Sequence, residues 1–91
     1  IMNKIQFYQK NTVNQLKNNR KYLESIKGVD SEIALWELKF YSDPPYRAVC
    51  MIKEYRIIVL EMFQGSGSHG EVMKWVPKAL KKAEEWYKQN N

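Results

Sequence analysis

The fold is decided by residues 36–63, which read WELKFY (36–41), SDPP (42–45), YRAVCMI (46–52), KEY (53–55) and RIIVLEMF (56–63). In the first segment, Trp36, Leu38 and Phe40 alternate with polar residues, which is the period of a half-buried strand. Pro44 and Pro45 lack an amide donor, so the chain must turn there. Only three residues separate the last two apolar segments. The stretch therefore predicts a three-stranded antiparallel meander.

Toward the N-terminus, the sequence predicts one further strand and a helix. Residues 4–8 (KIQFY) alternate over a short run of β-forming residues, which predicts a first strand. Thr12 and Gln15 then have the spacing of a capping box. An apolar stripe at helical spacing follows and ends before Gly28; its members are Val13, Leu16, Leu23 and Ile26. We therefore expect an amphipathic helix over residues 12–27.

Toward the C-terminus, the sequence predicts a loop and a basic helix. Residues 64–70 (QGSGSHG) hold three glycines and no apolar residue, so we expect a mobile surface loop. Pro77 suits the first turn of the helix that follows, and lysines crowd its polar side. Its apolar stripe consists of Val76, Leu80, Ala83, Trp86 and Tyr87. The order β, α, β, β, β, α predicts a small α+β domain.

The length of 91 residues predicts a single domain over residues 1–91, because so short a chain buries only about 60–65% of its unfolded surface. The apolar runs are far shorter than the roughly 20 residues that cross a bilayer. The first residues also lack the apolar stretch of a signal peptide. The single Cys50 excludes an internal disulfide and lies in an apolar run. We therefore expect a cytoplasmic protein with a buried thiol.

The net charge of +5 at pH 7 favours an encounter with an anionic partner, either nucleic acid or an acidic protein segment. A lysine-rich surface that only keeps the protein in solution has the same composition. The charge alone leaves both interpretations open.

Four short motifs follow one another along the chain. They are LWELKF (35–40), PYRAV (45–49), IVLEMF (58–63) and Pro77 with Ala83 six residues later. Together they resemble the RelE superfamily of bacterial toxins, most closely its HigB-like and phage-derived branches. The resemblance extends from about residue 4 to residue 88. It implies a RelE-like fold in which the meander and the N-terminal strand form one antiparallel sheet, packed with an N-terminal helix and a C-terminal helix.

The resemblance implies the toxin of a bacterial or phage toxin–antitoxin module, neutralised by a small antitoxin protein. Many members cut messenger RNA on the ribosome without metal or organic cofactor, by attack of the ribose 2′-hydroxyl on the adjacent phosphate. Such a site needs cationic donors where negative charge develops and a group that transfers a proton. The implied partners are therefore the antitoxin and ribosome-bound messenger RNA.

Three catalytic residues are predicted, two of them, Arg47 and Lys39, from the resemblance and the third, His69, from its side-chain chemistry. Arg47 occupies the position of the family's strand arginine, and a guanidinium can bind two phosphate oxygens at once. Lys39 stands where the family's ELR motif has arginine. The lysine pair that the family carries after the Phe63 position is replaced by QGS (64–66). His69 is the only histidine, the side-chain type whose ordinary pKa best suits proton transfer near neutrality.

Whether Lys39 and Arg47 act together depends on the strand register. If the turn spans residues 42–46, Tyr41 pairs with Arg47, and the two cations are diagonal neighbours on one face. A four-residue turn would place them on opposite faces. If residues 53–55 form the next turn, Arg47 lies opposite Glu61, which favours a cross-strand ion pair as strongly as a phosphate site.

Further residues are predicted to contact RNA. The lysines of the C-terminal helix suit nonspecific phosphate contacts, and an aromatic side chain near its end could stack on a base. The competing interpretation is that these aromatic residues belong to the core and the lysines to a solvated surface. The predicted RNA-binding residues are Arg56, Lys78, Lys81, Lys82 and Tyr87.

No cofactor is expected. The glycine-rich segment lacks the helix start and the lysine placement of a P-loop, so a nucleotide cofactor is not predicted. One histidine and one cysteine, His69 and Cys50, supply no recognisable set of metal ligands.

Two alternative functions assume the same fold but no cleavage of RNA. Like the ParE branch, the protein could act by binding another protein, with the missing lysine pair as the signature. It could also be a phage-derived domain that retains only its interaction with an antitoxin. In each case, an acidic partner with an amphipathic segment would complement the +5 charge and the basic helix.

Overall fold

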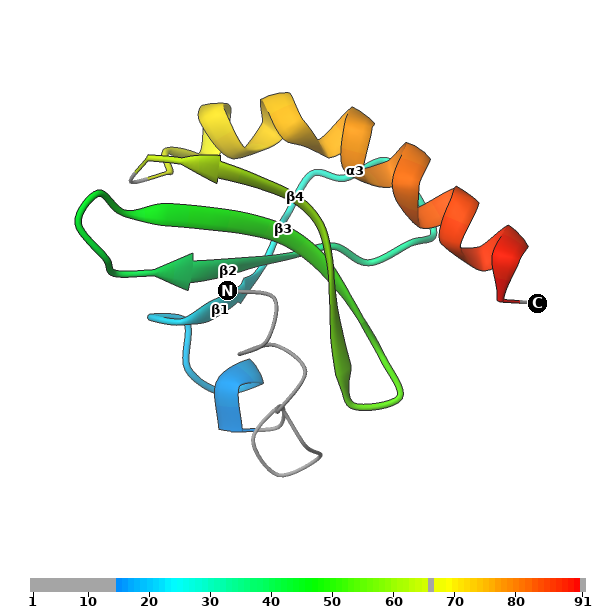
Figure 1. Cartoon of the computed structure of the whole chain (residues 1–91), viewed down its shortest axis with the longest axis horizontal. Coiled ribbons are helices and arrows are strands. Elements are labelled where there is room, and N and C mark those ends of the chain that lie inside the picture. The colour runs from blue at the N-terminus through cyan, green and yellow to red at the C-terminus, as the bar shows by residue number, and fades with distance from the viewer. Residues whose placement is uncertain (1–14, 66, 91) are drawn as a thin grey trace.

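The computed structural model describes residues 15–65 and 67–90 as a small α+β domain. One antiparallel sheet has its strands in chain order, and a single long helix lies along one of its faces (Figure 1). The elements are β1 (Leu23–Ser25), β2 (Trp36–Phe40), β3 (Tyr46–Lys53), β4 (Arg56–Gln64) and α3 (His69–Gln89). The predicted α+β class and the three-stranded meander of β2, β3 and β4 are confirmed.

The β3–β4 hairpin is tighter than the three-residue turn that the sequence predicted. Lys53 pairs with Arg56, so only Glu54 and Tyr55 form the turn. Both turn residues have a left-handed backbone, with φ of 51° and 62°. This is the pattern of a type I′ turn, whose twist matches that of the flanking strands.

The predicted helix over residues 12–27 is wrong in its second half. Residues 15–17 are helical, but β1 occupies the following segment and pairs with β2. Leu23 lies opposite Leu38 and is completely buried, so the pairing supplies backbone hydrogen bonds and a core contact that an isolated helix would lack. The predicted strand over residues 4–8, and the start of the predicted helix, lie outside the described residues.

The C-terminal helix begins eight residues earlier than Pro77, so the prediction that Pro77 occupies its first turn is wrong. The side chain of Ser68 caps α3 by accepting a hydrogen bond of 3.2 Å from the backbone N–H of Glu71. Ser68 and Glu71 have the spacing of a capping box, which explains the early start. Pro77 lies inside the helix, where it removes one backbone donor. Within the described residues, no helix has the length and apolar composition of a membrane crossing.

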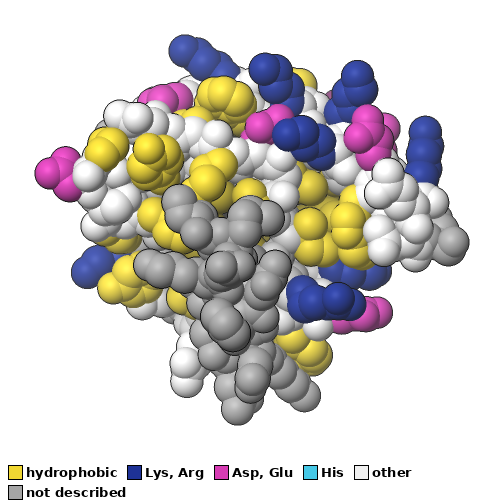
Figure 2. All heavy atoms as spheres, viewed as in Figure 1, with side chains coloured by type: hydrophobic (Ala, Val, Ile, Leu, Met, Phe, Trp, Pro, Cys, Tyr) yellow, Lys and Arg dark blue, Asp and Glu magenta, His cyan; other side chains and the backbone are white. Residues whose placement is uncertain are grey.

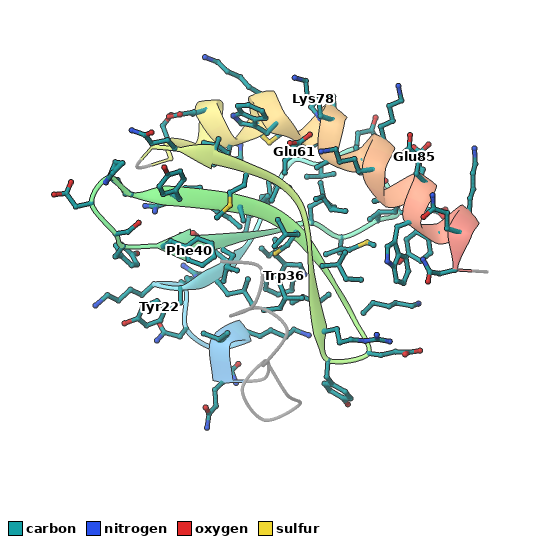
Figure 3. The ribbon with its side chains drawn as sticks, viewed as in Figure 1. Tyr22, Trp36, Phe40, Glu61, Lys78 and Glu85 are labelled. Atoms are coloured by element: carbon teal, nitrogen blue, oxygen red, sulfur yellow. The ribbon has the colours of Figure 1, made fainter. Side chains whose placement is uncertain are left out.

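The sheet separates two apolar clusters. The cluster between the sheet and α3 includes Val49, Met51, Phe63, Val72, Val76 and Ala83. The cluster on the other face includes Leu23, Leu38, Ala48, Cys50 and Ile57, with Trp36 and Phe40 packed against it. Figure 3 shows Trp36 and Phe40 on the side of the sheet away from α3, and Glu61 on the side that faces it.

A β-bulge interrupts the pairing of β3 with β4. Val49 pairs with Glu61 and Cys50 with Val59, so Leu60 is the extra residue. Leu60 belongs to the cluster beneath α3, and Glu61 pairs with Lys82 of the helix at 3.0 Å. The side chains of two consecutive residues of β4 therefore lie on the same side of the sheet.

Candidate functional site

A cavity of about 270 Å³ opens on the helix side of the sheet, near the start of α3. It is bounded by β1 and the residues just after it, by β2 and β3, and by the first turn of α3. Its lining consists of Glu24, Ser25, Ile26, Lys27, Glu37, Lys39, Arg47, Gly67, His69 and Val72. All three predicted catalytic residues, Lys39, Arg47 and His69, are in this set.

The strand register places Lys39 directly opposite Arg47. Directly opposite residues of an antiparallel pair project from the same face, so of the two alternatives left open by the sequence, the shared face is the one found. The expected diagonal register is wrong, because Phe40 pairs with Tyr46 and the turn occupies residues 41–45. The two cations are therefore nearer neighbours than a diagonal pair would be.

Lys39 is anchored by β1 and by the turn that precedes it. Its Nζ donates hydrogen bonds to a Glu24 carboxylate oxygen at 2.9 Å and to the Arg20 carbonyl oxygen at 2.8 Å. The hydrogen bond from Lys39 is the main cause of a lowered pKa for the Glu24 carboxyl. β1 thus supplies the counter-ion of a predicted catalytic lysine, and the turn just before β1 supplies a second, positioning contact.

Arg47 is buried, with 7% of its surface exposed. Its Nε lies 3.1 Å from a carboxylate oxygen of Glu37, and its Nη1 donates to the Tyr46 carbonyl oxygen at 3.1 Å. A buried guanidinium requires such a counter-ion. The predicted Arg47–Glu61 pairing is wrong, because the two-residue hairpin turn and the bulge together place Phe63 opposite Arg47.

The environment of Glu37 disfavours its charged form. Only 12% of its side chain is exposed, and this burial raises the pKa of the carboxyl above its ordinary value. The charges of Lys39 and Arg47 act in the opposite direction but are weaker than the effect of burial. Glu37 is therefore a carboxylate held next to two cations, in surroundings that favour its protonation more than water does.

Gly67 lies directly against the Arg47–Glu37 ion pair. A Cβ atom at this position would be 2.9 Å from Glu37 Oε2 and 3.0 Å from Arg47 Cγ. Its φ of +72° is also one that side chains disfavour. The glycine at this position therefore permits close approach of the backbone to the ion pair.

His69 is the first residue of α3, and not part of the glycine-rich loop in which the sequence placed it. The capping hydrogen bond of Ser68 starts the helix at this point, and His69 is exposed at the rim of the cavity. A rigid element thus carries the one imidazole of the chain to Lys39 and Arg47. Apart from His69, the cavity lining has three cations and two carboxylates, so the cations are in excess.

The predicted RNA-binding residues are not gathered at this cavity. Lys78, Lys81 and Lys82 are exposed on α3, and Figure 3 shows Lys78 pointing away from the sheet. Arg56 and Tyr87 instead line a second cavity, near the other end of the helix. The structure therefore divides the predicted set among the exposed surface of α3, the ion pair of Lys82 with Glu61 of β4, and a separate cavity.

Sequence reasoning missed the two carboxylates of the first cavity. The sequence placed Glu24 within the predicted helix over residues 12–27, and Glu37 among the polar residues that alternate with Trp36, Leu38 and Phe40. The signal for Glu37 was present, because residues two apart in a strand share a face and Glu37 is two residues from Lys39. Glu24 had no comparable signal, since its position depends on the pairing of β1 with β2. In the described residues no group of three or more His, Cys, Asp or Glu side chains could hold a metal ion.

No family model, curated protein or solved structure matches this chain. The resemblance to RelE-type toxins therefore rests on the four sequence motifs. The antiparallel sheet with its C-terminal helix is compatible with it at the level of architecture.

Proposed function

We propose that the protein is the toxin of a toxin–antitoxin pair and cleaves ribosome-bound messenger RNA, with the first cavity holding the ribose–phosphate linkage. One observation carries the proposal: Lys39, Arg47 and His69 come from three different elements and line one cavity. The sequence predicts all three for this chemistry from motif positions and side-chain type. Residues chosen for unrelated reasons would not be expected to converge in this way.

The three side chains suit the reaction. Lys39 and Arg47 stabilise the negative charge that accumulates on phosphorus as the 2′-oxygen attacks. His69 accepts the proton of the 2′-hydroxyl and, once protonated, gives a proton to the departing 5′-oxygen. The P–O5′ bond breaks and a 2′,3′-cyclic phosphate forms, so no net proton is consumed. This sequence of steps requires no metal or organic cofactor.

The ion pairs of the cavity set a condition on substrate binding. Glu24 and Glu37 hold Lys39 and Arg47 before any ligand arrives. A phosphodiester must therefore replace a carboxylate oxygen at one or both cations. We expect RNA affinity to depend on this exchange, and on the wider positive charge of the protein that attracts the strand.

The test is induced expression in a bacterial host, followed by mapping of RNA 5′ ends. The wild-type protein should produce cuts within translated codons. Lys39→Gln and His69→Ala should each reduce cutting by about 100-fold or more, because each removes a group that acts in the transition state. Intact messages in cells that express the folded wild-type protein would contradict the proposal.

Two controls accompany this test. Lys88→Gln removes a cation from the last turn of α3, which lies outside the lining of the first cavity, and should leave the cuts unchanged. Arg47→Ala leaves Glu37 buried without its counter-ion and could unfold the protein. Arg47→Lys retains the charge and tests the guanidinium itself, provided that circular dichroism shows a folded protein.

A second function, growth inhibition by protein binding alone, is favoured by one observation. Both cavity cations are already satisfied by carboxylates, as they would be in a purely structural ion-pair network. Growth arrest with intact messages, unaffected by Lys39→Gln, would support this function. Both functions include neutralisation by an acidic antitoxin, and co-purification with the product of the neighbouring gene tests that partner.

A further inference from the structure

A second cavity, of about 310 Å³, lies between the tip of the β3–β4 hairpin and the last turns of α3. Its lining consists of Lys53, Glu54, Arg56, Ile58, Trp86, Tyr87 and Asn90. Its size is at the lower end of the range for small-ligand sites. Tyr87 is eighteen positions after His69 in α3, which corresponds to about 27 Å along the helix. The second cavity is therefore distinct from the proposed reaction site.

Aromatic rings form one wall of this cavity. Trp86 and Tyr87 lie edge to face, with centroids 5.2 Å apart and an interplanar angle of 87°. Both are only partly buried although they pack against the cluster beneath α3, and Ile58 adds an apolar contact from β4. Figure 2 shows apolar side chains exposed beside lysine and arginine side chains on the side of the molecule where α3 ends. A flat ring can stack on such a surface.

Two cations of the hairpin also line this cavity. Lys53 and Arg56 pair directly across the hairpin, so their side chains project from the same face of the ribbon. The Lys53 Nζ lies over the Tyr87 ring, 5.5 Å from its centre, so an ammonium group and an aromatic ring are in contact at this cavity.

The counter-ion of Arg56 is weakly held. Its Nη2 is 3.6 Å from a Glu54 carboxylate oxygen, and both side chains are more than 70% exposed. Such an exposed pair contributes little, so a phosphate can readily exchange for Glu54. The first cavity differs in this respect, because its arginine is buried with its carboxylate.

We propose that this second cavity holds one nucleotide unit of a single-stranded RNA, with the base against Tyr87 and Trp86 and its phosphate between Lys53 and Arg56. An aromatic surface beside paired cations is the combination with which proteins hold unpaired nucleotides. The inference rests on the proposed function, since it concerns a second contact of the same RNA. Its distance from His69 makes it a site that contributes affinity and position, and no chemistry.

The first experiment is photo-crosslinking of a short RNA that contains 4-thiouridine, followed by mass spectrometry of the protein. We expect crosslinks at Trp86 or Tyr87 in addition to crosslinks at the first cavity. Uridine monophosphate is tested in parallel as a competitor. Removal of the crosslinks only by large excess of the mononucleotide supports a subsite of an RNA strand. Tight binding of the mononucleotide with no RNA crosslink there would assign a free-nucleotide site instead and would overturn the inference.

The second experiment compares two double variants of equal charge. Lys53→Gln with Arg56→Gln removes both cations of the second cavity, whereas Lys74→Gln with Lys88→Gln removes two exposed cations of α3 outside its lining. At matched ionic strength, the first variant should bind RNA about tenfold more weakly than the second, and Tyr87→Leu should have a similar effect through lost stacking. Equal affinities of the two double variants would contradict the inference.

The outcomes separate this inference from the proposed function. A wild-type protein that neither binds nor cleaves RNA would refute both. A protein that cleaves RNA, crosslinks only at the first cavity and loses nothing in Lys53→Gln with Arg56→Gln would refute the second site alone. Circular dichroism of each variant establishes that it is folded.

Discussion

At the residue scale, the chemistry of the first cavity depends on a three-way contact among Arg47, Glu37 and Gly67. The guanidinium and the carboxylate are 3.1 Å apart, and Gly67 is close enough that a Cβ would meet both side chains. Glu37 thus occupies a place that a phosphate oxygen would take on Arg47. The same carboxylate that makes a buried arginine tolerable also competes with the anion that it is proposed to bind.

Replacing Glu37 with glutamine should make this competition visible. Glu37→Gln removes the charge but keeps the size, so inorganic phosphate should bind the cavity more tightly than in the wild-type protein. Because a ligand that binds only the folded state raises stability, the melting temperature should rise more steeply with phosphate concentration in this variant. Glu85→Gln, on the exposed side of α3, is the matched control. Equal phosphate dependence in all three proteins would contradict the prediction.

Because burial raises the pKa of Glu37, the competition between its carboxylate and phosphate should depend on pH. The folded protein binds this proton more tightly than the unfolded chain, so the contribution of Glu37 to stability is greatest below its ordinary pKa of 4.5 and falls as pH rises through the raised value. Protonation also removes the competing charge. Phosphate affinity of the wild-type protein should therefore increase as pH falls through this window, and Glu37→Gln should lack that increase.

Gly67→Ala should destabilise the protein by about 1–3 kcal/mol, because it combines a left-handed backbone with a collision against Glu37 and Arg47. Gly70→Ala is the control. A Cβ at Gly70 would have no heavy atom within 4 Å, and alanine favours the helix in which it lies. Chemical denaturation measures both variants. A stability of Gly67→Ala at or above that of Gly70→Ala would refute the proposed close approach.

The residue types of the site were largely predictable, but their electrostatic partners were not. Lys39, Arg47 and His69 were selected from motif positions and amino-acid chemistry, and they line the same cavity. Their carboxylate partners depend on register. The pairing of Lys39 with Glu24 requires a strand that the sequence pattern assigned to a helix, and the pairing of Arg47 with Glu37 replaces the expected pairing with Glu61.

At the element scale, α3 connects the two cavities. Its first residue, His69, lies at the first cavity, and Tyr87 in its last turns lies at the second. The start of this helix is set by one side-chain cap at Ser68. The position of the imidazole relative to Lys39 and Arg47 therefore depends on a local hydrogen bond.

Ser68→Ala should remove this cap and cost about 1 kcal/mol of stability. The first turn of α3 should fray, which displaces His69, so the cleavage rate should fall by more than the loss of folded protein explains. Ser68→Asp retains an acceptor for the Glu71 N–H and should restore both properties. Urea denaturation and the cleavage assay measure the two effects. An unchanged cleavage rate in Ser68→Ala would show that the cap does not position His69.

Element prediction succeeded where the pattern is long and failed where it is short. The strands β2, β3 and β4 follow alternation and turn residues that can be read locally. In contrast, β1 has only three residues, and Leu23 also fits a helical stripe. Its strand conformation comes from pairing with β2, a non-local interaction that overrides local propensity. The early start of α3 did have a local signal, the Ser68 and Glu71 capping box, which the proline at position 77 obscured.

At the scale of the whole molecule, the sheet separates an apolar cluster beneath α3 from another on the opposite face. β3 serves both, because Val49 and Met51 face α3 while Ala48 and Cys50 face away. Neither cluster can lose its packing without disturbing this central strand. We therefore expect the described domain to unfold as one cooperative unit.

Cys50 offers a direct measure of this cooperativity. Its side chain is completely buried, and burial raises the pKa of the thiol to about 12. In the native protein a thiol reagent should therefore react with Cys50 only when the chain unfolds, and the labelling rate should increase with urea in parallel with the unfolded fraction. The less stable Gly67→Ala variant should be labelled faster at every urea concentration. Labelling at the rate of an exposed thiol without denaturant would contradict this prediction.

The β-bulge at Leu60 divides the longest hairpin into two registers, with Arg47 on one side of the break and Lys53 and Arg56 on the other. The outer arm of the hairpin lies between this bulge and the turn. Deleting or inserting one residue in each of its strands, at positions that pair with each other, would leave the pairing and the side-chain orientation of the inner arm unchanged. An engineer could therefore graft a foreign hairpin tip beyond Met51 and Ile58 without disturbing the proposed reaction centre. The sequence and length of the outer arm can therefore change during evolution while the register of the inner arm stays the same.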